Sequence, residues 1–188
     1  MINDGQAAPL ILASASPRRR ELLAQAVIPF VVHPVDIDES PMPGEPPAEM
    51  VERLAGSKAA AAGALFPNRV ILAADTTVVL DGQIIGKPVD MDEARSYINR
   101  LSGRKHEVYT GVCIEGGGSD GHLWHAVTAV TFNTLTPDFI ERYLAAVQPL
   151  DKAGGYGIQV HEKELIARYD GLRSTVVGLP IEDVIGKL

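Results

Sequence analysis

The sequence contains a single cysteine, Cys113, among its 188 residues. One cysteine cannot form an intramolecular disulfide, so nothing in the chain requires an oxidising compartment. No apolar run approaches the roughly 18 residues that a membrane span needs, and the start from Met1 to Pro9 lacks the basic stretch of a signal peptide. We therefore expect a protein of the cytoplasm that has no membrane partner.

Positive charge is also scarce. The 17 Lys and Arg residues are outnumbered by 24 Asp and Glu residues, which gives a formal net charge of −7. This balance argues against a nucleic-acid partner, because basic surface supplies most of the affinity for a phosphate backbone. A small phosphate compound remains a suitable ligand wherever a few cations gather locally. The length and the 46% apolar content are those of one globular domain, expected to span residues 1–188.

Short apolar runs that alternate with helical segments predict a mixed α/β fold. Strands are expected at 10–13, 30–32, 70–74, 78–80, 83–85, 108–114 and 123–132, and helices at 18–26, 48–65, 92–101, 137–146 and 181–188. The segments 165–167 and 175–177 are interpreted as further strands, and 116–121 as a glycine-rich connection. Because no repeat or linker is visible, we expect a mixed sheet flanked by helices, in two lobes around a central cleft.

Three arginines occupy the first turn of the helix that a Ser-Pro pair begins at 16–17. Acidic side chains are normally favoured there, because the helix dipole is positive at that end. A bound anion would explain why arginines stand where acidic side chains are favoured, since free amides and forked guanidinium groups both suit a phosphate. We predict that Arg18 and Arg19 bind phosphate, with Ser14 as a hydroxyl donor, while Arg20 faces water. A fully solvated arginine face is the alternative.

An aspartate, Asp75, interrupts the apolar run 70–74 and is expected to end that strand. Open α/β sheets place their ligands at such positions, so Asp75 is a candidate metal ligand or proton acceptor. An aspartate that caps the following turn is an equally good interpretation. Glu39 offers a hard oxygen to Mg²⁺ or Mn²⁺, and Lys58 and Lys87 offer point charges to phosphate. Taken singly, these last three side chains are interpreted as solvated.

Five segments of the sequence together resemble the Maf family, whose members are also called septum formation inhibitor proteins. The matching segments follow the order of the family along the chain: 12–19, 74–79, 86–88, 151–159 and 177–180. The resemblance implies a two-lobed α/β fold related to the inosine triphosphate pyrophosphatases. It also implies hydrolysis of a nucleoside triphosphate to monophosphate and pyrophosphate with a divalent metal cation, Mg²⁺ or Mn²⁺.

Residue by residue, the resemblance makes Asp75 the catalytic base. The other active-site positions of the family fall on eight side chains: Ser14, Arg18, Arg19, Glu39, Lys58, Thr76, Lys87 and Gln159. Among them, Arg18, Thr76 and Gln159 match specificity positions. Glu39, together with Asp75, is the expected metal site. The Asp-Thr pair at 75–76 and the Tyr-Gly-Ile-Gln segment at 156–159 resemble the branch of the family that hydrolyses dTTP and UTP.

Other functions stay open at this point. A sister branch acts on 7-methyl-GTP and tends to carry Asp-Gln where this chain has Asp-Thr at 75–76. An inosine or xanthosine triphosphatase is a second enzymatic alternative. A nucleotide-binding regulator of septum formation is the non-enzymatic one. The sequence also does not decide whether Asp75 is the base or a metal ligand. A homodimer is one of the assemblies that the sequence allows.

Overall fold

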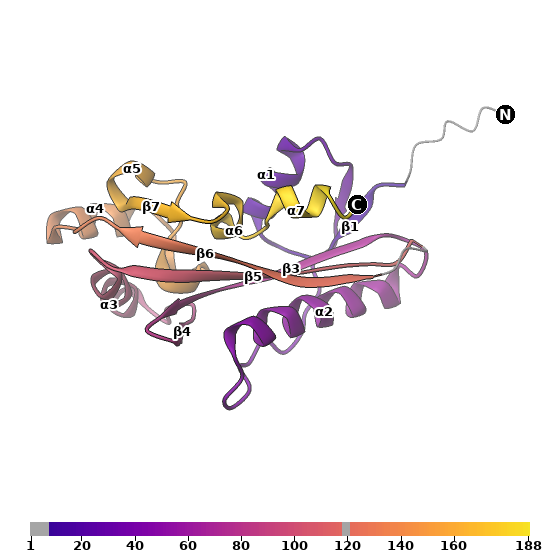
Figure 1. Ribbon diagram of the computed structural model, residues 1–188, viewed down its shortest axis with the longest axis horizontal. Coiled ribbons are helices and arrows are strands. Elements are labelled where there is room, and N and C mark those ends of the chain that lie inside the picture. The colour runs from indigo at the N-terminus through magenta and orange to yellow at the C-terminus, as the bar shows by residue number, and fades with distance from the viewer. Residues whose placement is uncertain (1–7, 118–120) are drawn as a thin grey trace.

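The computed structural model describes residues 8–117 and 121–188 of the chain. Residues 1–7, which were expected to contain no signal peptide, lie outside the described residues. So do residues 118–120, in the middle of the predicted connection 116–121. In the described part, seven strands form one mixed sheet and helices cover both of its faces (Figure 1). The predicted α/β class is therefore confirmed. None of the described helices has the length and apolarity needed to cross a bilayer.

The elements lie close to the predicted segments. The strands are β1 (Leu10–Leu12), β2 (Phe30–Val32), β3 (Ile71–Leu80), β4 (Gln83–Ile85), β5 (Lys105–Glu115), β6 (His122–Phe132) and β7 (Ile166–Asp170). The helices are α1 (Pro17–Gln25), α2 (Pro47–Leu65), α3 (Met91–Leu101), α4 (Pro137–Ala146), α5 (Glu162–Leu165), α6 (Arg173–Val177) and α7 (Ile181–Ile185). Two 3-10 turns, η1 (Pro149–Asp151) and η2 (Ala153–Gly155), follow α4.

The strand order is β2-β1-β3-β5-β6-β7, and β4 pairs with β3 as the hairpin that Asp81-Gly82 predicts. Strand β1 runs parallel to both of its neighbours, whereas each adjacent pair along β3, β5, β6 and β7 is antiparallel. The pairing of β1 with β3 ends at Leu12 and Leu72. From residue 73 to residue 77, β3 pairs with β5 alone, and its other edge is open until β4 pairs with it from Val78 onward.

The side chains of β1 and β3 alternate between two layers of core. Leu12 and Leu72 point to the face that α1 and α7 cover, where they pack near Leu23. Ile11 and Ile71 point to the opposite face and pack against the alanines of α2. Figure 1 shows α2 along one face of the sheet and α1, α6 and α7 along the other. Neighbouring residues of β3 therefore reach different layers.

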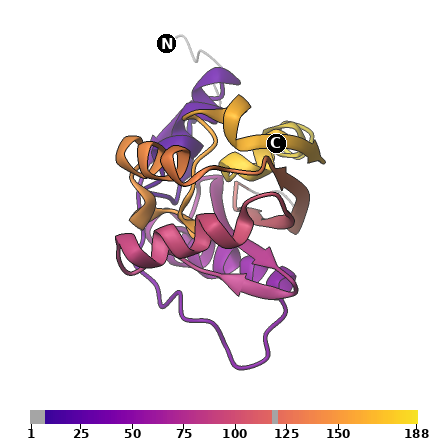
Figure 2. The same ribbon diagram turned by 90° about the vertical axis from the view of Figure 1, so that its left-hand side faces the viewer.

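A third group of buried side chains joins α3, α4 and the segment 154–158 to the far end of the sheet, which faces the viewer in Figure 2. Within it, the Tyr143 hydroxyl donates to the carbonyl oxygen of Gly157 at 2.9 Å and accepts from the Gly157 amide at 2.9 Å. Tyr143 is fully buried. Its two hydrogen bonds fix the course of the chain just before Gln159.

Two predictions about local structure are wrong. Asp75 does not end a strand, because β5 supplies backbone partners from Ile71 to Val79 without a break, and Asp75 pairs with Gly111. The segment 175–177 is not a strand but lies in α6. Its β-branched residues favour a strand, yet Gly178 ends a helical turn there with φ of 116°.

The start of α1 differs from the prediction in one detail. Ser16 occupies the N-cap position before Pro17, as predicted, but its side chain makes no capping hydrogen bond. The Ser14 hydroxyl oxygen instead accepts from the Ser16 amide at 3.2 Å. In α4, by contrast, the Thr136 side chain accepts from the amide of Phe139 at 3.2 Å.

Candidate active site

A cleft of about 330 Å³ opens where β1 ends and β3 continues. It is bounded by the start of α1, the middle of β3, the loop around Glu39, the segment 151–159 and the end of α6. Five cationic side chains and three carboxylates line it: Arg18, Arg19, Lys58, Lys87, Lys152, Glu39, Asp75 and Asp151. The cleft is thus locally cationic in a chain of net charge −7, which is the arrangement that a small polyanion requires.

Asp75 points to the face of the sheet that α2 covers, and there it meets Lys58. The Lys58 Nζ atom lies 2.7 Å from Asp75 Oδ1. Lys58 is only 7% exposed, so its interpretation as a solvated lysine is wrong. A sequence signal was present, because Val51, Lys58 and Ala62 share the helical spacing of one buried stripe of α2.

The same ammonium group also holds Glu39. Lys58 Nζ lies 2.5 Å from Glu39 Oε1, and Lys87 Nζ lies 3.5 Å from Glu39 Oε2. Desolvation raises the pKa of Glu39, but the hydrogen bonds and charges of the two lysines outweigh it and lower that pKa below its ordinary value. Two carboxylates therefore share one lysine at the mouth of the cleft.

Close packing against Gly111 brings α2 near enough for this contact. Gly111 is the cross-strand partner of Asp75 and lies on the same face of the sheet. A Cβ atom at Gly111 would lie 2.2 Å from the carbonyl oxygen of Val51. Only glycine allows the α2 backbone to approach β5 this closely.

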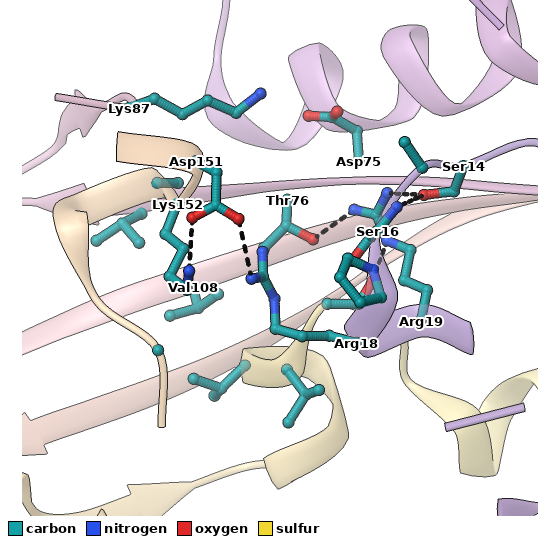
Figure 3. Close-up of a pocket in the computed structure, with 18 of the residues that line it drawn as sticks. Ser14, Ser16, Arg18, Arg19, Asp75, Thr76, Lys87, Val108, Asp151 and Lys152 are labelled. Carbon is teal, nitrogen blue, oxygen red and sulfur yellow. Dashed lines mark hydrogen bonds and ion pairs between the residues drawn. The ribbon is translucent and has the colours of Figure 1, made fainter. Parts of the chain in front are cut away.

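On the opposite face, Arg19 is held by three hydrogen bonds, of which Figure 3 shows those to Ser14 and Thr76. Its Nη1 donates to Ser14 Oγ at 3.0 Å, its Nη2 to Thr76 Oγ1 at 3.1 Å, and its Nε to the carbonyl oxygen of Gly178 at 2.8 Å. Desolvation lowers the pKa of Arg19, and the carboxylate of Asp75 acts against that shift. Arg20 is exposed, as predicted.

Arg18 also lines the cleft, and it faces an acidic partner that the sequence did not single out. Its Nη1 lies 3.6 Å from Asp151 Oδ2, and Asp151 Oδ1 lies 2.5 Å from Lys152 Nζ. Desolvation raises the pKa of Asp151, but the bond to Lys152 and the charges of both cations lower it overall. Lys152 is a further cation of the cleft that the sequence did not single out.

The remaining predicted residues lie at the rim. Lys87 has 58% of its side chain exposed, and Gln159 is an exposed residue that lines the cleft beside Gly157. The structure therefore brings all of the predicted site residues to one cleft: Ser14, Arg18, Arg19, Glu39, Lys58, Asp75, Thr76, Lys87 and Gln159. Among the described residues no group of three or more His, Cys, Asp or Glu is placed to hold a metal ion. Of the three cleft carboxylates, Glu39 and Asp75 both contact Lys58 and so lie close enough together for one ion in the cleft to use both.

Comparison with known proteins gives a consistent picture. A family model described as Maf-like protein matches residues 9–188. The dTTP/UTP pyrophosphatase of Moorella thermoacetica is 50% identical over 177 residues, which cover 93% of this chain and 91% of the relative. That of Symbiobacterium thermophilum is 46% identical over 179 residues, covering 95% and 92%. The solved structure of the Staphylococcus aureus Ham1 protein covers 95% of this chain and 99% of its own, with a TM-score of 0.52 at 14% identity. That last likeness concerns the fold alone.

Proposed function

We propose that this chain, which belongs to the family of Maf-like proteins, hydrolyses the bond between the α- and β-phosphates of a nucleoside triphosphate. The products are a nucleoside monophosphate and pyrophosphate. The names of the two bacterial relatives favour dTTP and UTP as substrates. The observation that carries the proposal is the cleft itself, in which five cationic side chains surround an aspartate that lies on a strand.

The cations of the cleft lie on both faces of the sheet. Arg18 and Lys152 lie on one side of the cleft, and Lys58 and Lys87 lie on the other. A triphosphate bound between them would meet positive charge along its whole length, so binding neutralises a chain of oxygens that otherwise repel one another. The phosphates would displace Arg18 from Asp151, since that ion pair is long, at 3.6 Å.

Asp75 is the proposed base. Its Oδ1 is bonded to Lys58, which leaves Oδ2 to accept a proton from a water molecule. The water oxygen forms a bond to the α-phosphorus while the bond from that phosphorus to the bridging oxygen breaks, and pyrophosphate leaves with the electron pair. Positioning of the water and neutralisation of the phosphate charge supply most of the rate enhancement.

A divalent cation fits the donors that the cleft presents. Glu39 and Asp75 offer hard carboxylate oxygens, and Mg²⁺ commonly uses one or two carboxylates together with substrate phosphates and water. Their two bonded oxygens lie 2.5 and 2.7 Å from one Lys58 nitrogen, so they are close neighbours. When bound, the cation would neutralise charge that develops on the phosphate oxygens. In that arrangement Glu39 is the main ligand, because Asp75 acts as base.

The base of the nucleotide would meet Gln159 at the rim. Its amide offers both a donor and an acceptor, which matches the edge of a pyrimidine. A polar pocket rejects bases that leave its groups unpaired. Equal hydrolysis of purine and pyrimidine triphosphates would contradict this role. A preference for 7-methyl-GTP or inosine triphosphate would instead favour one of the two alternative enzymatic functions.

The test is a panel of triphosphates incubated with the purified protein and Mg²⁺ or Mn²⁺, with identification of the products. In water enriched in ¹⁸O, attack at the α-phosphorus places the label in the monophosphate, whereas attack at the β-phosphorus places it in pyrophosphate. Asp75→Asn should abolish turnover and leave the fold intact, while the exposed Asp138→Asn should retain activity. Tight nucleotide binding without any product would instead favour a regulator.

A further inference from the structure

A closed ring of hydrogen bonds holds the guanidinium group of Arg19. Arg19 Nη2 donates to Thr76 Oγ1 at 3.1 Å, and Thr76 Oγ1 lies 3.0 Å from Thr110 Oγ1. Thr110 Oγ1 donates to the carbonyl oxygen of Thr175 at 2.8 Å. The Gly178 amide donates to the same carbonyl at 3.0 Å, and the Gly178 carbonyl accepts from Arg19 Nε at 2.8 Å. The ring joins α1, β3, β5 and the end of α6.

The sheet register explains why the two hydroxyls meet. Thr76 and Thr110 are direct cross-strand partners, so both side chains point to the face that α6 covers. Asp75, one residue earlier, pairs with Gly111 and points to the other face. Thr110 is fully buried and makes no contact with the cleft, whose lining includes Thr76 but not Thr110.

The direction of every hydrogen bond in the ring is fixed. A hydroxyl has one hydrogen, and Thr110 donates its hydrogen to the Thr175 carbonyl, which can only accept. Thr76 must therefore donate to Thr110. Its oxygen can then accept from Arg19, which has only donors. Thr76 consequently has no hydrogen left for a ligand, and its hydroxyl acts by orienting Arg19.

We propose that Thr110 is a positioning residue of the active site, which acts through Thr76 to present the Arg19 guanidinium to the phosphates of the substrate. This inference rests on the proposed function for the identity of the substrate. Without the Thr110 hydroxyl, the Thr76 hydroxyl is free to rotate and to turn its hydrogen toward Arg19. The arginine then loses one of its three fixed partners and samples other orientations, so bound phosphate is stabilised less.

Thr128 provides a matched control. It is also fully buried, lies on the neighbouring strand β6, and donates its hydroxyl hydrogen at 2.8 Å to the carbonyl of Leu172, just before α6. Thr128→Val and Thr110→Val therefore remove the same kind of hydrogen bond between the sheet and the same chain segment. Only Thr110→Val breaks the ring around Arg19. A loss that came merely from loosening α6 would follow both substitutions equally.

The experiment compares kcat and KM for dTTP among Thr110→Val, Thr110→Ser and Thr128→Val, with melting temperatures measured alongside. We expect Thr110→Val to lower kcat/KM about tenfold, Thr110→Ser to restore it to within about twofold, and Thr128→Val to leave it unchanged although both valine variants lose similar stability. In an Arg19→Lys background, which lacks the fork that the ring holds, Thr110→Val should add less than about twofold.

Wild-type kcat/KM in Thr110→Val, an equal loss in Thr128→Val, or a full tenfold loss in the Arg19→Lys background would each overturn the proposal. The readout can be separated from the proposed reaction by measuring the affinity of the same variants for inorganic tripolyphosphate with Mg²⁺ by calorimetry. If the wild-type protein binds tripolyphosphate but hydrolyses no nucleotide, the proposed function fails. The proposal for Thr110 then stands or falls on whether Thr110→Val weakens that binding and Thr128→Val does not.

Discussion

Protonation of one buried histidine should set the acid limit of stability for this protein. His106 lies on β5 with 2% of its surface exposed, and its Nε2 lies 2.8 Å from the hydroxyl of Tyr156. The ring packs edge-on against Phe132 and Tyr156, with centroids 4.9 and 5.5 Å away. Desolvation lowers the pKa of His106 from 6.5 to about 4, and the backbone of Arg104, as an acceptor for the ring, acts in the opposite direction.

The sign of the effect follows from proton binding in the two states. The unfolded chain binds a proton at His106 below its ordinary pKa, whereas the folded chain resists protonation until about pH 4. Between these values the unfolded state holds more protons, so the free energy of unfolding falls as the pH is lowered through this window. At about 1.4 kcal/mol per pKa unit, the full contribution is roughly 3 kcal/mol.

Urea unfolding of the wild type and of His106→Gln at about pH 7 and about pH 4.5 measures this contribution. Carboxylates titrate in both proteins and cancel in the comparison, so the wild type should lose about 2 to 3 kcal/mol more than the variant. The exposed His122 supplies the control, because His122→Gln should behave as the wild type. If the wild type and His106→Gln lose the same stability between the two pH values, the reasoning about desolvation is refuted.

Three further predictions concern the layer between α2 and the sheet. Gly111→Ala should cost about 1 to 3 kcal/mol of stability in urea unfolding, because its Cβ meets the Val51 carbonyl at 2.2 Å. Gly56→Ala, where a Cβ finds only atoms of Leu123 at 4.0 Å, should instead stabilise α2 by about 0.5 to 1 kcal/mol, and a loss would show that the helix is strained there. Lys58→Met should lower the free energy of unfolding by about 2 kcal/mol, since Asp75 loses a charged hydrogen-bond donor. Lys87→Met, at a 58% exposed side chain, should change it by less than about 0.5 kcal/mol, and equal losses would contradict the burial argument.

Much of the fold could be predicted because local patterns and tertiary packing agree. The stretch 47–65 has the composition and length of a helix and is one, and Asp81 and Gly82 adopt the positive φ that their hairpin requires. The C-terminal part was harder. There α5 spans only Glu162–Leu165, and α6 ends in three β-branched residues, 175–177, that favour strands. Its hydrogen bonds to the sheet, through Thr110 and Thr128, override that preference and are invisible in the sequence.

The candidate site was predictable as a set of residues but not as a set of contacts. The family resemblance named the side chains, and the cleft gathers them. It did not reveal that one lysine, Lys58, bridges Glu39 and Asp75. Asp151 and Lys152 lie within a matching segment, yet the contacts of Asp151 with Arg18 and Lys152 depend on the course of η1 and η2. Long-range contacts of this kind follow from sheet register, which apolar periodicity alone does not fix.

The position of Asp75 inside a continuous strand explains how one short motif serves both sides of the cleft. In a strand, neighbouring side chains point to opposite faces, so Asp75 meets Lys58 from α2 while Thr76 meets Arg19 from α1. Both can reach a common ligand only where the adjacent strand has ended, and β1 ends at Leu12, level with Leu72. A longer β1 would cover this edge and separate the two groups of cations. The short β1 and the long β3 are therefore as necessary to the site as the charged residues themselves.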